Sequence, residues 1–558
     1  MRPWAALPAR GAYRRRARIA DACLVALLTL VHPAFAAQLP GNIDPGAQRQ
    51  RAQQDLREQE RQEREKARQQ RPANPIQGPA GPRGGNLPNN AQVFTLQAIH
   101  FPKSHFLKAD TLQAIAADYL HRPIRFRDLN AMLARINTLY RHRGIITAAA
   151  YIPPQTITDG ALRVALLEGR LGKLEVRDAH YTDAAIVRRW LDVSPGDIVD
   201  VPRLRDTINR INRGTNLGLR ASIQAGAKPG QSDLVVDVQE PPHRLLRTFI
   251  DNHGASSTGE WEGGVVGILN GPAGRGDRLT LYTIDSRGSR NGVLRYAIPV
   301  NGYGGVLDLS RSGGRIKVIH GPYKDLDVKG TSSDTALGYS QPLFEGPLSG
   351  MSLNTRLSRS ESSTKVSGVR ISDVTVREGE IGLTWFRRSK AGYLQVSQSV
   401  QRANVDAPGL PTRHFNLYPG TLSYACLLSG RWTAHVRAAW QGASDANLPS
   451  SIGYQLGGAD TIRGYEQGAV SGGRGYRLTL GTDYRWQRNL SQSLFLDYGW
   501  VDQGTSGDTT LASVGTGLSW QWTSHLSIQG TLGLPQRTVT ADQDRARADV
   551  RLTFEYPF

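Results

Sequence analysis

The sequence predicts a transmembrane antiparallel β-barrel of about 16 strands, preceded by an N-terminal α-helix and two domains of βααββ order. Three observations support this fold class. Apolar and polar residues alternate with period two from about residue 243 to the end of the 558-residue chain. Residues 93–169 and 170–242 repeat one order of strand and helix patterns. A polar run of roughly 24 residues without a helix breaker precedes both repeats.

The first 36 residues are typical of a secretory signal peptide. Six arginines precede the apolar run CLVALLTLV, and the small residues AFA at 34–36 stand at the spacing of a cleavage site. We expect residues 1–36 to be removed on export. Cys23 leaves with that peptide and Cys426 remains alone, so the exported chain can form no internal disulfide. A large core or a closed sheet must therefore hold the fold.

The chain is basic, with a formal net charge of +20. A basic chain can bind nucleic acid, but an exported one meets anionic lipid headgroups and acidic polypeptides instead. A solubilising surface charge is an equally simple explanation. We expect no nucleic-acid partner, and the charge alone selects no function.

Residues 37–71 are expected to form a helix that is polar on every face. Asp44 is a plausible N-cap, Pro45 takes the first helical position, and Leu56 is the only large apolar side chain in the run. Such a helix cannot dock on an apolar core, so it is solvated, disordered or placed inside something polar. Its length of about 36 Å is close to the height of a membrane barrel. Residues 72–92, rich in Pro, Gly and Asn, follow as a linker.

The two repeats each indicate one strand, two helices and two further strands. In the first repeat, residues 93–169, apolar side chains recur on one face of the second helix and Gly144 ends that helix. These side chains are Leu129, Leu133, Ile136 and Tyr140. Residues 170–242 repeat the same order, so the repeat is one of whole small domains.

Residues 243–558 carry the alternation that predicts the barrel. In YRLTLGTDYRW, residues 476–486, one face is apolar or aromatic and the other is small or polar. A β-sandwich or a soluble barrel would also alternate. Segments of about 9–11 residues, aromatic residues at their ends and export without disulfides favour an outer-membrane barrel with a polar lumen. The alternation continues to the terminal Phe558.

No catalytic or cofactor motif stands out. The sequence has no phosphate-binding glycine loop with Lys-Ser/Thr, no HExxH, no paired CxxC and no Gly-x-Ser-x-Gly, and its 12 histidines are scattered. We therefore expect no enzyme activity, no cofactor and no metal site.

One loop has an unusual composition. Residues 454–476, YQLGGADTIRGYEQGAVSGGRGY, contain seven glycines, and Asp460 and the triplet Arg463, Gly464 and Tyr465 lie among them. Glycine permits backbone angles closed to other residues, so the loop can fold into a crowded space.

The combination resembles the transporter subunit of two-partner secretion systems, the family of the filamentous haemagglutinin and haemolysin exporters. The stretch YRHRGIITAAAYIPPQTITDGALRVALLEGRLGKLEV, residues 140–176, is similar to the signature of the family's first repeat. AGAKPGQSDLVVDVQE, residues 225–240, resembles the end of its second repeat. YQLGGADTIRGY resembles the motif of its long sixth extracellular loop, and LFLDYGWVD resembles the barrel strand that follows.

The resemblance implies an outer-membrane, porin-like channel of a Gram-negative bacterium that carries an unfolded exoprotein to the cell surface without ATP. Residues 93–169 and 170–242 would be periplasmic polypeptide-transport-associated (POTRA) domains, residues 243–558 the barrel, and the polar helix a plug in its pore. The implied partners are a large secreted exoprotein with an N-terminal secretion domain, outer-membrane lipid and the barrel assembly machinery.

The resemblance also assigns residues. Substrate binding in the first repeat would involve Tyr140, Gly144, Tyr151, Pro153, Pro154, Glu168 and Gly169, and Phe558 would end the barrel-assembly signal. Arg463 would reach into the lumen and pair with a carboxylate. Asp497 is the leading candidate because it lies on the polar parity of its strand and the family pairs these positions. Asp483 and Asp460 remain rivals.

Two other functions compete with secretion. An outer-membrane protein assembly factor shares the repeats, the barrel and the loop, but usually carries more repeats and lacks the polar helix. A passive porin or adhesin barrel would have no use for two periplasmic repeats. The sequence leaves open whether the cargo is an adhesin, a cytolysin or a contact-dependent toxin, and whether one barrel or two act together.

Overall fold

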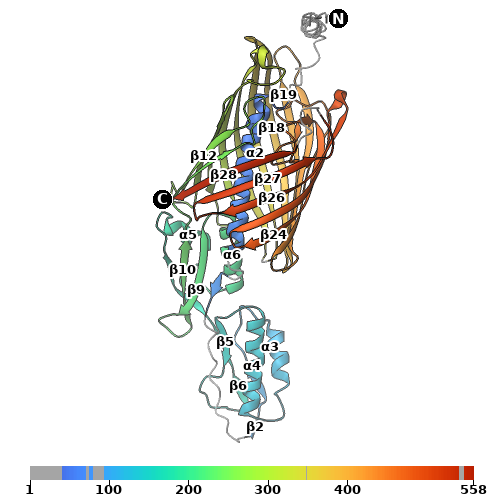
Figure 1. Cartoon of the computed structure of the whole chain (residues 1–558). Helices are drawn as coiled ribbons and strands as arrows, with labels where there is room; N and C mark the ends of the chain where they lie inside the picture. Colours follow the sequence, from blue (N-terminus) through green and yellow to red (C-terminus); the bar gives the residue numbers. More distant parts are fainter. Residues whose placement is uncertain (1–40, 71–74, 79–92, 347, 540–545) are drawn as a thin grey trace, which may run out of the picture.

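The computed structural model describes residues 41–70, 75–78, 93–346, 348–539 and 546–558. The expected signal peptide and most of the expected linker lie outside the described residues. Figure 1 shows a tall barrel that encloses helix α2, Pro45–Gln70, with two small domains stacked below one rim.

The barrel is closed by 16 antiparallel strands, as the sequence predicts. Each strand pairs with the next along the chain, and the last strand, β28, pairs with the first, β11. Strands β22, Tyr454–Leu456, and β23, Val470–Gly472, form a separate hairpin in the glycine-rich loop between β21 and β24. The barrel strands are β11 Arg244–Asp251, β12 Glu262–Asn270, β13 Arg278–Ser286, β14 Ser289–Pro299, β15 Val306–Lys317, β16 Lys329–Glu345, β17 Ser349–Val366, β18 Val369–Arg388, β19 Gly392–Asp406, β20 Arg413–Leu427, β21 Trp432–Ala443, β24 Arg474–Gln487, β25 Leu490–Asp502, β26 Asp508–Gln521, β27 Leu526–Pro535 and β28 Arg547–Pro557.

The outer face of the barrel is apolar and the lumen is polar. Large apolar side chains are exposed around the wall, among them Leu281, Leu337, Leu480 and Leu494. Aromatic side chains gather near the rim that faces the small domains: Trp432, Trp486, Trp520 and Trp522. An apolar band bordered by aromatic residues is the surface that a lipid bilayer covers.

Several strands are longer than predicted. The sequence pattern indicates segments of about 9–11 residues, whereas β17 has 18 residues and β18 has 20. The end of β17 at the rim far from the small domains is largely polar, with Ser360, Ser362 and Ser363. Strand pairing continues there because a hairpin keeps its hydrogen bonds in water, where the apolar alternation is no longer needed.

The first small domain has the predicted βααββ order, except that its first and last strands each divide in two and a short strand lies between the helices. Its helices are α3, Ala109–Ala117, and α4, Phe126–His142, and both pack on one buried apolar cluster. The expected first strand divides into β2, Val93–Thr95, and β3, Ala98–His100, because β2 pairs with β4, Pro123–Arg125, while β3 pairs with β6, Ala161–Arg163. Strand β5, Ala148–Tyr151, pairs with β7, Ala165–Glu168.

The second small domain has this order with undivided strands. Helices α5, Ala184–Leu191, and α6, Val201–Gly214, pack on a sheet of β8, Arg170–Arg177, β9, Gly218–Ala225, and β10, Gln231–Gln239. The edge of this sheet carries one more strand that the sequence did not predict. It is β1, Ile76–Gln77, from the region expected to be a linker.

The second domain touches the barrel rim closely. The Arg213 side chain of α6 forms an ion pair with Glu345 of β16 and donates a hydrogen bond to the Gly346 carbonyl at 3.1 Å. A Cβ atom on Gly214 would lie 2.6 Å from the Gly304 carbonyl oxygen, so only glycine permits this approach. These contacts hold the second domain at the rim of the barrel.

Candidate functional site

Helix α2 fills the middle of the barrel lumen (Figure 1). It begins as predicted, because the Asp44 side chain accepts a hydrogen bond from the Ala47 amide at 2.8 Å and Pro45 takes the first helical position. Ion pairs of both polarities join its side chains to the wall. They are Arg49–Asp334 at 3.7 Å, Arg51–Glu262 at 2.6 Å, Asp55–Arg551 at 3.2 Å, Glu63–Arg247 at 2.7 Å, Glu63–Arg278 at 2.9 Å and Glu60–Arg295.

Two of these contacts lie where the barrel closes. Arg551 of β28 donates hydrogen bonds to Asp251 of β11 at 2.8 Å and to Asp55 of the helix at 3.2 Å. The helix therefore contacts both strands of the closing pair through one guanidinium group. A second bridge of this kind, nearer the small domains, consists of Arg247, Glu555 and Glu63.

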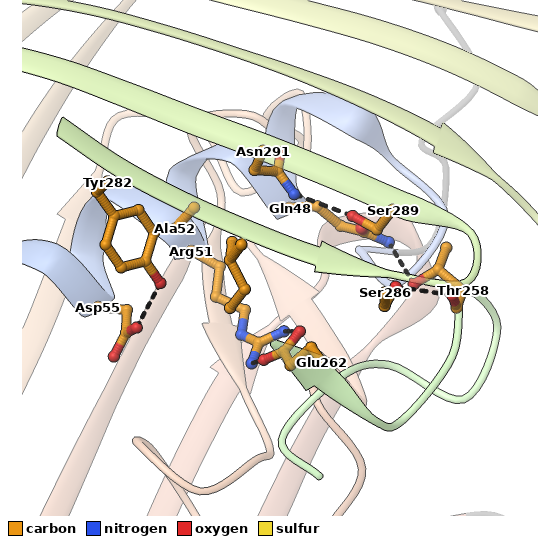
Figure 2. A pocket seen from close by; sticks show the side chains of 11 residues that line it. Gln48, Arg51, Ala52, Asp55, Thr258, Glu262, Tyr282, Ser286, Ser289 and Asn291 are labelled. Atoms are coloured by element: carbon orange, nitrogen blue, oxygen red, sulfur yellow. Dashed lines mark hydrogen bonds and ion pairs between the residues drawn. The ribbon is translucent and has the colours of Figure 1, made fainter. Parts of the chain in front are cut away.

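Figure 2 shows the polar contact between the helix and the first strands of the barrel. The Arg51 guanidinium faces the Glu262 carboxylate, and the Asp55 carboxylate accepts a hydrogen bond from the Tyr282 hydroxyl at 2.6 Å. Gln48 donates a hydrogen bond to the Thr258 hydroxyl at 3.4 Å. Charged and amide groups of the helix are therefore matched by wall groups rather than by open water.

The expectation that the helix cannot pack on an apolar surface is wrong at Leu56. Leu56 is only 3% exposed and, with Ala52, joins a buried apolar cluster on the wall. The wall members of this cluster are Phe249, Val266, Ile268, Tyr282, Ile284 and Val293. These apolar side chains of the first barrel strands face the lumen, where a water-filled channel would have polar ones. The helix covers them and keeps them out of water.

The N-terminal end of the helix is held at the rim far from the small domains. Ile43 is buried with Val318 and Val328, and the Ser332 hydroxyl donates a hydrogen bond to the Pro45 carbonyl at 2.8 Å. The Ser257 hydroxyl donates to the Asn42 carbonyl at 2.7 Å. The described contacts thus fix the helix from its start to Glu63.

The glycine-rich loop folds back into the lumen, and Arg463 contacts Asp497 of β25. The Arg463 Nε atom donates to Oδ2 of Asp497 at 2.7 Å, its Nη2 atom donates to Oδ1 at 2.8 Å, and its backbone amide donates to Oδ2 at 3.2 Å. Thr479 donates a further hydrogen bond to Asp497 at 2.8 Å. The Arg463 guanidinium also lies over the Phe495 ring, 3.3 Å from its centre. A fully buried carboxylate thus holds the loop by a bidentate pair.

The two residues after Arg463 fix the loop against β26 and β27. Gly464 has φ +90°, and a Cβ atom there would lie 2.9 Å from the Gly533 carbonyl carbon. Tyr465 is fully buried, and its hydroxyl lies 2.9 Å from the Ala512 carbonyl and 2.8 Å from the Arg537 carbonyl. Each residue of the triplet therefore has its own contact: Arg463 supplies the charge, Gly464 permits the close backbone approach, and Tyr465 supplies the buried ring.

The two rival carboxylates make other contacts. The Asp483 carboxylate lies 3.2 Å from the His435 ring and is partly exposed. The Asp460 carbonyl accepts a hydrogen bond from Arg477 at 2.7 Å, and no contact between the Asp460 side chain and Arg463 is found among the described residues. Asp497 is therefore the carboxylate that Arg463 meets.

Two of the residues expected to bind substrate in the first domain, Tyr140 and Glu168, contact each other. The Tyr140 hydroxyl donates to the Glu168 carboxylate at 3.0 Å, and burial raises the pKa of that hydroxyl above its ordinary value. Glu168 also accepts from the Ser104 hydroxyl at 2.5 Å and the His105 amide at 2.9 Å. These contacts fasten α4 to β7.

The other predicted residues of this domain lie at turns. Gly144, with φ +76°, follows Arg143, the C-cap of α4, and the Gly169 amide donates to the Thr147 carbonyl at 3.0 Å. Tyr151 ends β5, and Pro153 and Pro154 follow it. The structure therefore does not bring the seven predicted residues into one pocket.

The sequence analysis missed the wall residues that hold the helix. Asp251, Glu262, Tyr282 and Arg551 are luminal and contact α2 or its partners. The alternation of each strand marks them as facing the lumen. It carries no signal for which of them faces the helix, since that depends on the rotation of α2 inside the closed barrel.

Two further kinds of feature, a metal-binding cluster and a membrane-spanning helix, are absent from the described residues. Within them, no group of three His, Cys, Asp or Glu side chains is placed to hold a metal ion. No helix of the described ranges is long and apolar enough to cross a membrane.

Comparisons with known proteins match two parts of the chain to described families. Residues 230–520 match the haemolysin secretion/activation protein family ShlB/FhaC/HecB. Residues 94–169 match the POTRA domain, ShlB-type.

Individual proteins are similar over most of the chain. The heme/hemopexin transporter protein HuxB of Haemophilus influenzae is 26% identical over 464 residues, which cover 76% of this chain and 80% of HuxB. The outer membrane transporter CdiB of Dickeya dadantii is 24% identical over 472 residues, which cover 79% of this chain and 83% of that protein. The solved structure of CdiB from Escherichia coli has a TM-score of 0.72 at 20% identity, over 94% of this chain and 100% of that one, which shows a shared fold.

Proposed function

The chain belongs to the haemolysin secretion/activation protein family ShlB/FhaC/HecB, and from that premise we propose how it moves its secreted partner through the outer membrane. The two small domains receive the unfolded exoprotein in the periplasm, through its N-terminal secretion domain. The barrel then conducts the exoprotein to the cell surface without ATP. Folding of the exoprotein outside the cell supplies the free energy.

The observation that supports this proposal best is the occupied lumen. Helix α2 carries wall contacts from Ile43 at the extracellular rim to Glu63 near the periplasmic one. An extended chain cannot pass a lumen that holds this helix, so transport requires the helix to leave or shift. The helix is then a resident plug, and the second domain, docked at the rim through Arg213, delivers the exoprotein to the lumen that the plug vacates.

The contacts of the plug suit reversible binding. Most are ion pairs and hydrogen bonds, whose favourable energy is largely offset by the loss of water from both partners. The apolar part is small, since Ala52 and Leu56 are its helix members. Burying one leucine contributes about 1.5–3 kcal/mol. A polar helix can therefore close the lumen firmly and still exchange its wall contacts for water without a large penalty.

The remaining parts have supporting roles in the proposal. Residues 37–71 act as plug, 93–169 and 170–242 as receiving domains, and 243–558 as conduit. Phe558 follows β28, the strand that closes the barrel, and its amide donates to the Arg244 carbonyl at 2.9 Å. The barrel assembly machinery reads this C-terminal strand during insertion. The protein carries no enzyme activity of its own.

Secretion by whole cells tests the proposal. The transporter is expressed in an Escherichia coli strain that has no such system, together with a candidate secreted protein, a large exported protein with an N-terminal secretion domain. We expect the secreted protein in the medium or on the cell surface, and in the periplasm when the transporter is absent. Equal surface amounts with and without the transporter would refute the proposal. A periplasmic protein with no secretion domain serves as the control for leakage.

A further inference from the structure

The outer face of strands β14 to β18 changes from apolar to basic toward the extracellular rim. Side chains that are partners in the strand register and point outward form rows across these strands. One row is apolar and consists of Tyr296, Leu309, Leu337 and Leu357. The next outward row toward the rim consists of Leu294, Arg311, Thr335, Arg359 and Arg377. Its three arginines, here called the lower row, therefore lie directly above the surface that the bilayer covers.

At the extracellular end of β15 to β18 the outward row is made of cations alone. Its four successive register partners, here called the upper row, are Lys317, Lys329, Lys365 and Arg370. All four residues are exposed. One step closer to the membrane, Arg290 of β14 lies opposite Arg315 of β15. Like charges directly opposite each other destabilise a sheet, so these rows cost stability unless an anion binds to them.

The chain's own carboxylates balance only part of this charge. Nearby ion pairs are Arg290–Asp285 at 2.7 Å, Lys329–Asp327 at 2.7 Å, Arg359–Glu361 at 2.9 Å and Arg370–Asp373 at 2.6 Å. Arg315, Lys317 and Lys365 form no ion pair with any residue that the structure describes. Exposed pairs of this kind are weak. An anion that reaches several of the cations at once can therefore compete with the carboxylates.

The other side of the barrel has no such excess of cations. The outward row that ends β24, β25 and β26 at the same rim consists of Arg474, Asp502 and Asp508. It has one cation and two carboxylates, whereas the upper row has four cations. The charge is therefore confined to one sector of the wall, which favours a local site over a general surface charge.

The height of the two rows identifies the anion. At about 3.3 Å per residue and a strand tilt of about 40°, Arg311 lies roughly 5 Å above Leu309 along the barrel axis, and Lys317 lies roughly 20 Å above it. The headgroup region of a bilayer extends only about 5–7 Å beyond the hydrocarbon on each side. A phospholipid headgroup therefore reaches the lower row but not the upper one. A ligand for both rows must carry anionic groups far above its acyl chains.

We propose that the lower and upper rows together bind lipopolysaccharide, the glycolipid of the outer leaflet. Its lipid A phosphates lie at the headgroup level and meet the lower row. The phosphates and carboxylates of its sugar core stand higher and meet the upper row. Guanidinium and ammonium groups are the usual protein ligands of phosphate. Bound lipid then neutralises the facing cations and fixes the depth of this side of the barrel in the membrane. The inference uses the outer-membrane location of the chain and not its transport activity.

Lipid binding to the full-length wild-type transporter in detergent tests the site first. The probes are a rough lipopolysaccharide with a phosphorylated core, a lipopolysaccharide from a strain that does not phosphorylate its core, and phosphatidylglycerol. Affinities are measured at physiological ionic strength, where nonspecific attraction between distant charges is screened. We expect the phosphorylated form to bind at least fivefold more tightly than the unphosphorylated form, and phosphatidylglycerol to bind more weakly than both. Equal binding of the two lipopolysaccharides would overturn the proposal.

A charge-matched pair of variants tests the upper row. The upper-row variant combines Lys317→Gln, Lys329→Gln and Lys365→Gln. The control variant combines Lys390→Gln, Arg431→Gln and Arg488→Gln, which make the same charge change at exposed turns of the periplasmic rim. We expect the upper-row variant to bind phosphorylated lipopolysaccharide at least tenfold more weakly than the wild type, and the control to stay within twofold. Phosphatidylglycerol should bind all three equally. Equal losses of lipopolysaccharide binding in both variants would show an effect of net charge and overturn the site.

Two competitors test other occupants of the same face. Polyglutamate stands for an acidic polypeptide. If it binds the wild type as tightly as lipopolysaccharide does and loses the same affinity in the upper-row variant, the face binds protein and the lipid assignment fails. An excess of inorganic phosphate should leave lipopolysaccharide bound, and complete displacement would assign the site to free phosphate instead.

Heat-modifiable migration checks that each variant is a folded barrel. If the upper-row variant loses this property, the comparison of the two lipopolysaccharides decides, because it uses the wild type alone. None of these measurements depends on secretion. A transporter that binds lipopolysaccharide as expected but exports nothing would refute the proposed function and leave the lipid site standing.

Discussion

Replacing Arg463 with alanine removes the cation from the pair that ties the glycine-rich loop to the barrel wall. Asp497 is fully buried and accepts three hydrogen bonds from Arg463, two from its guanidinium group and one from its backbone amide. The alanine variant keeps the amide and the Thr479 hydroxyl as donors. It loses the charge that balances the buried carboxylate and the contact with the Phe495 ring.

The size of this loss follows from the burial of the pair. Removing one partner of a buried ion pair costs about 3–5 kcal/mol. The remaining donors and the 18% exposure of the Arg463 side chain reduce the cost, so we take about 2–3 kcal/mol for the docked loop. This corresponds to about a 30- to 160-fold fall in the ratio of docked to undocked loop. The barrel ladders do not involve this pair, so the barrel should still assemble.

The assay compares Arg463→Ala with Arg474→Ala, a control from the end of the same loop. Arg474 is exposed, pairs with Asp502 at 3.5 Å and donates a hydrogen bond to the Ala443 carbonyl at 2.9 Å, so its loss should cost about 1 kcal/mol. We expect both variants to assemble as heat-modifiable barrels in the outer membrane. Arg463→Ala should secrete strongly less exoprotein, and its loop should be cut faster by protease added to cells. Normal secretion by Arg463→Ala, or equal defects in both variants, would refute the role of the pair.

Three further changes test the plug and the loop. Deleting residues 38–70 should raise the ion conductance of the barrel in a planar bilayer, and unchanged conductance would contradict a resident plug. Leu56→Ala should cost about 2 kcal/mol of plug binding and raise the frequency of open events about 30-fold, whereas Gln54→Ala, at an exposed position, should change nothing. Gly464→Ala should undock the loop and reduce secretion, because its Cβ atom would meet the Gly533 backbone. The control Gly468→Ala places its Cβ atom no closer than 3.6 Å to any atom, so it should secrete more than Gly464→Ala. More secretion by Gly464→Ala than by Gly468→Ala would contradict the close-approach argument.

The parts of the fold that depend on local pattern could be predicted from the sequence. Alternation along β24 and β25 assigns each residue to lipid or lumen, and it places Asp497 on the luminal side before any contact is known. The strand count follows from the length of the alternating region. The helix start at Asp44 and Pro45 follows from capping preferences that act within one turn.

The parts that depend on contacts between distant segments could not be predicted. Strand β1 has two residues in a region rich in Pro, Gly and Asn, and it exists only because the β9 edge pairs with it. Leu56 is a lone apolar residue in a polar helix, and its dock is formed by wall residues from four different strands. The wall carboxylate that pairs with Arg51 is set by the rotation of the helix and by the register of the barrel strands. Neither can be read from the sequence around Arg51.

The central claim is that the exoprotein passes through the lumen that α2 now fills. The most direct test holds the plug in place. Gln53 of α2 donates a hydrogen bond to the Ser312 hydroxyl of β15 at 2.7 Å, so cysteines at these two positions can be joined by a short thiol cross-linker that a reductant cleaves. We predict that secretion stops when the helix is cross-linked and returns when the link is cleaved. Undiminished secretion with the plug cross-linked to the wall would contradict the claim.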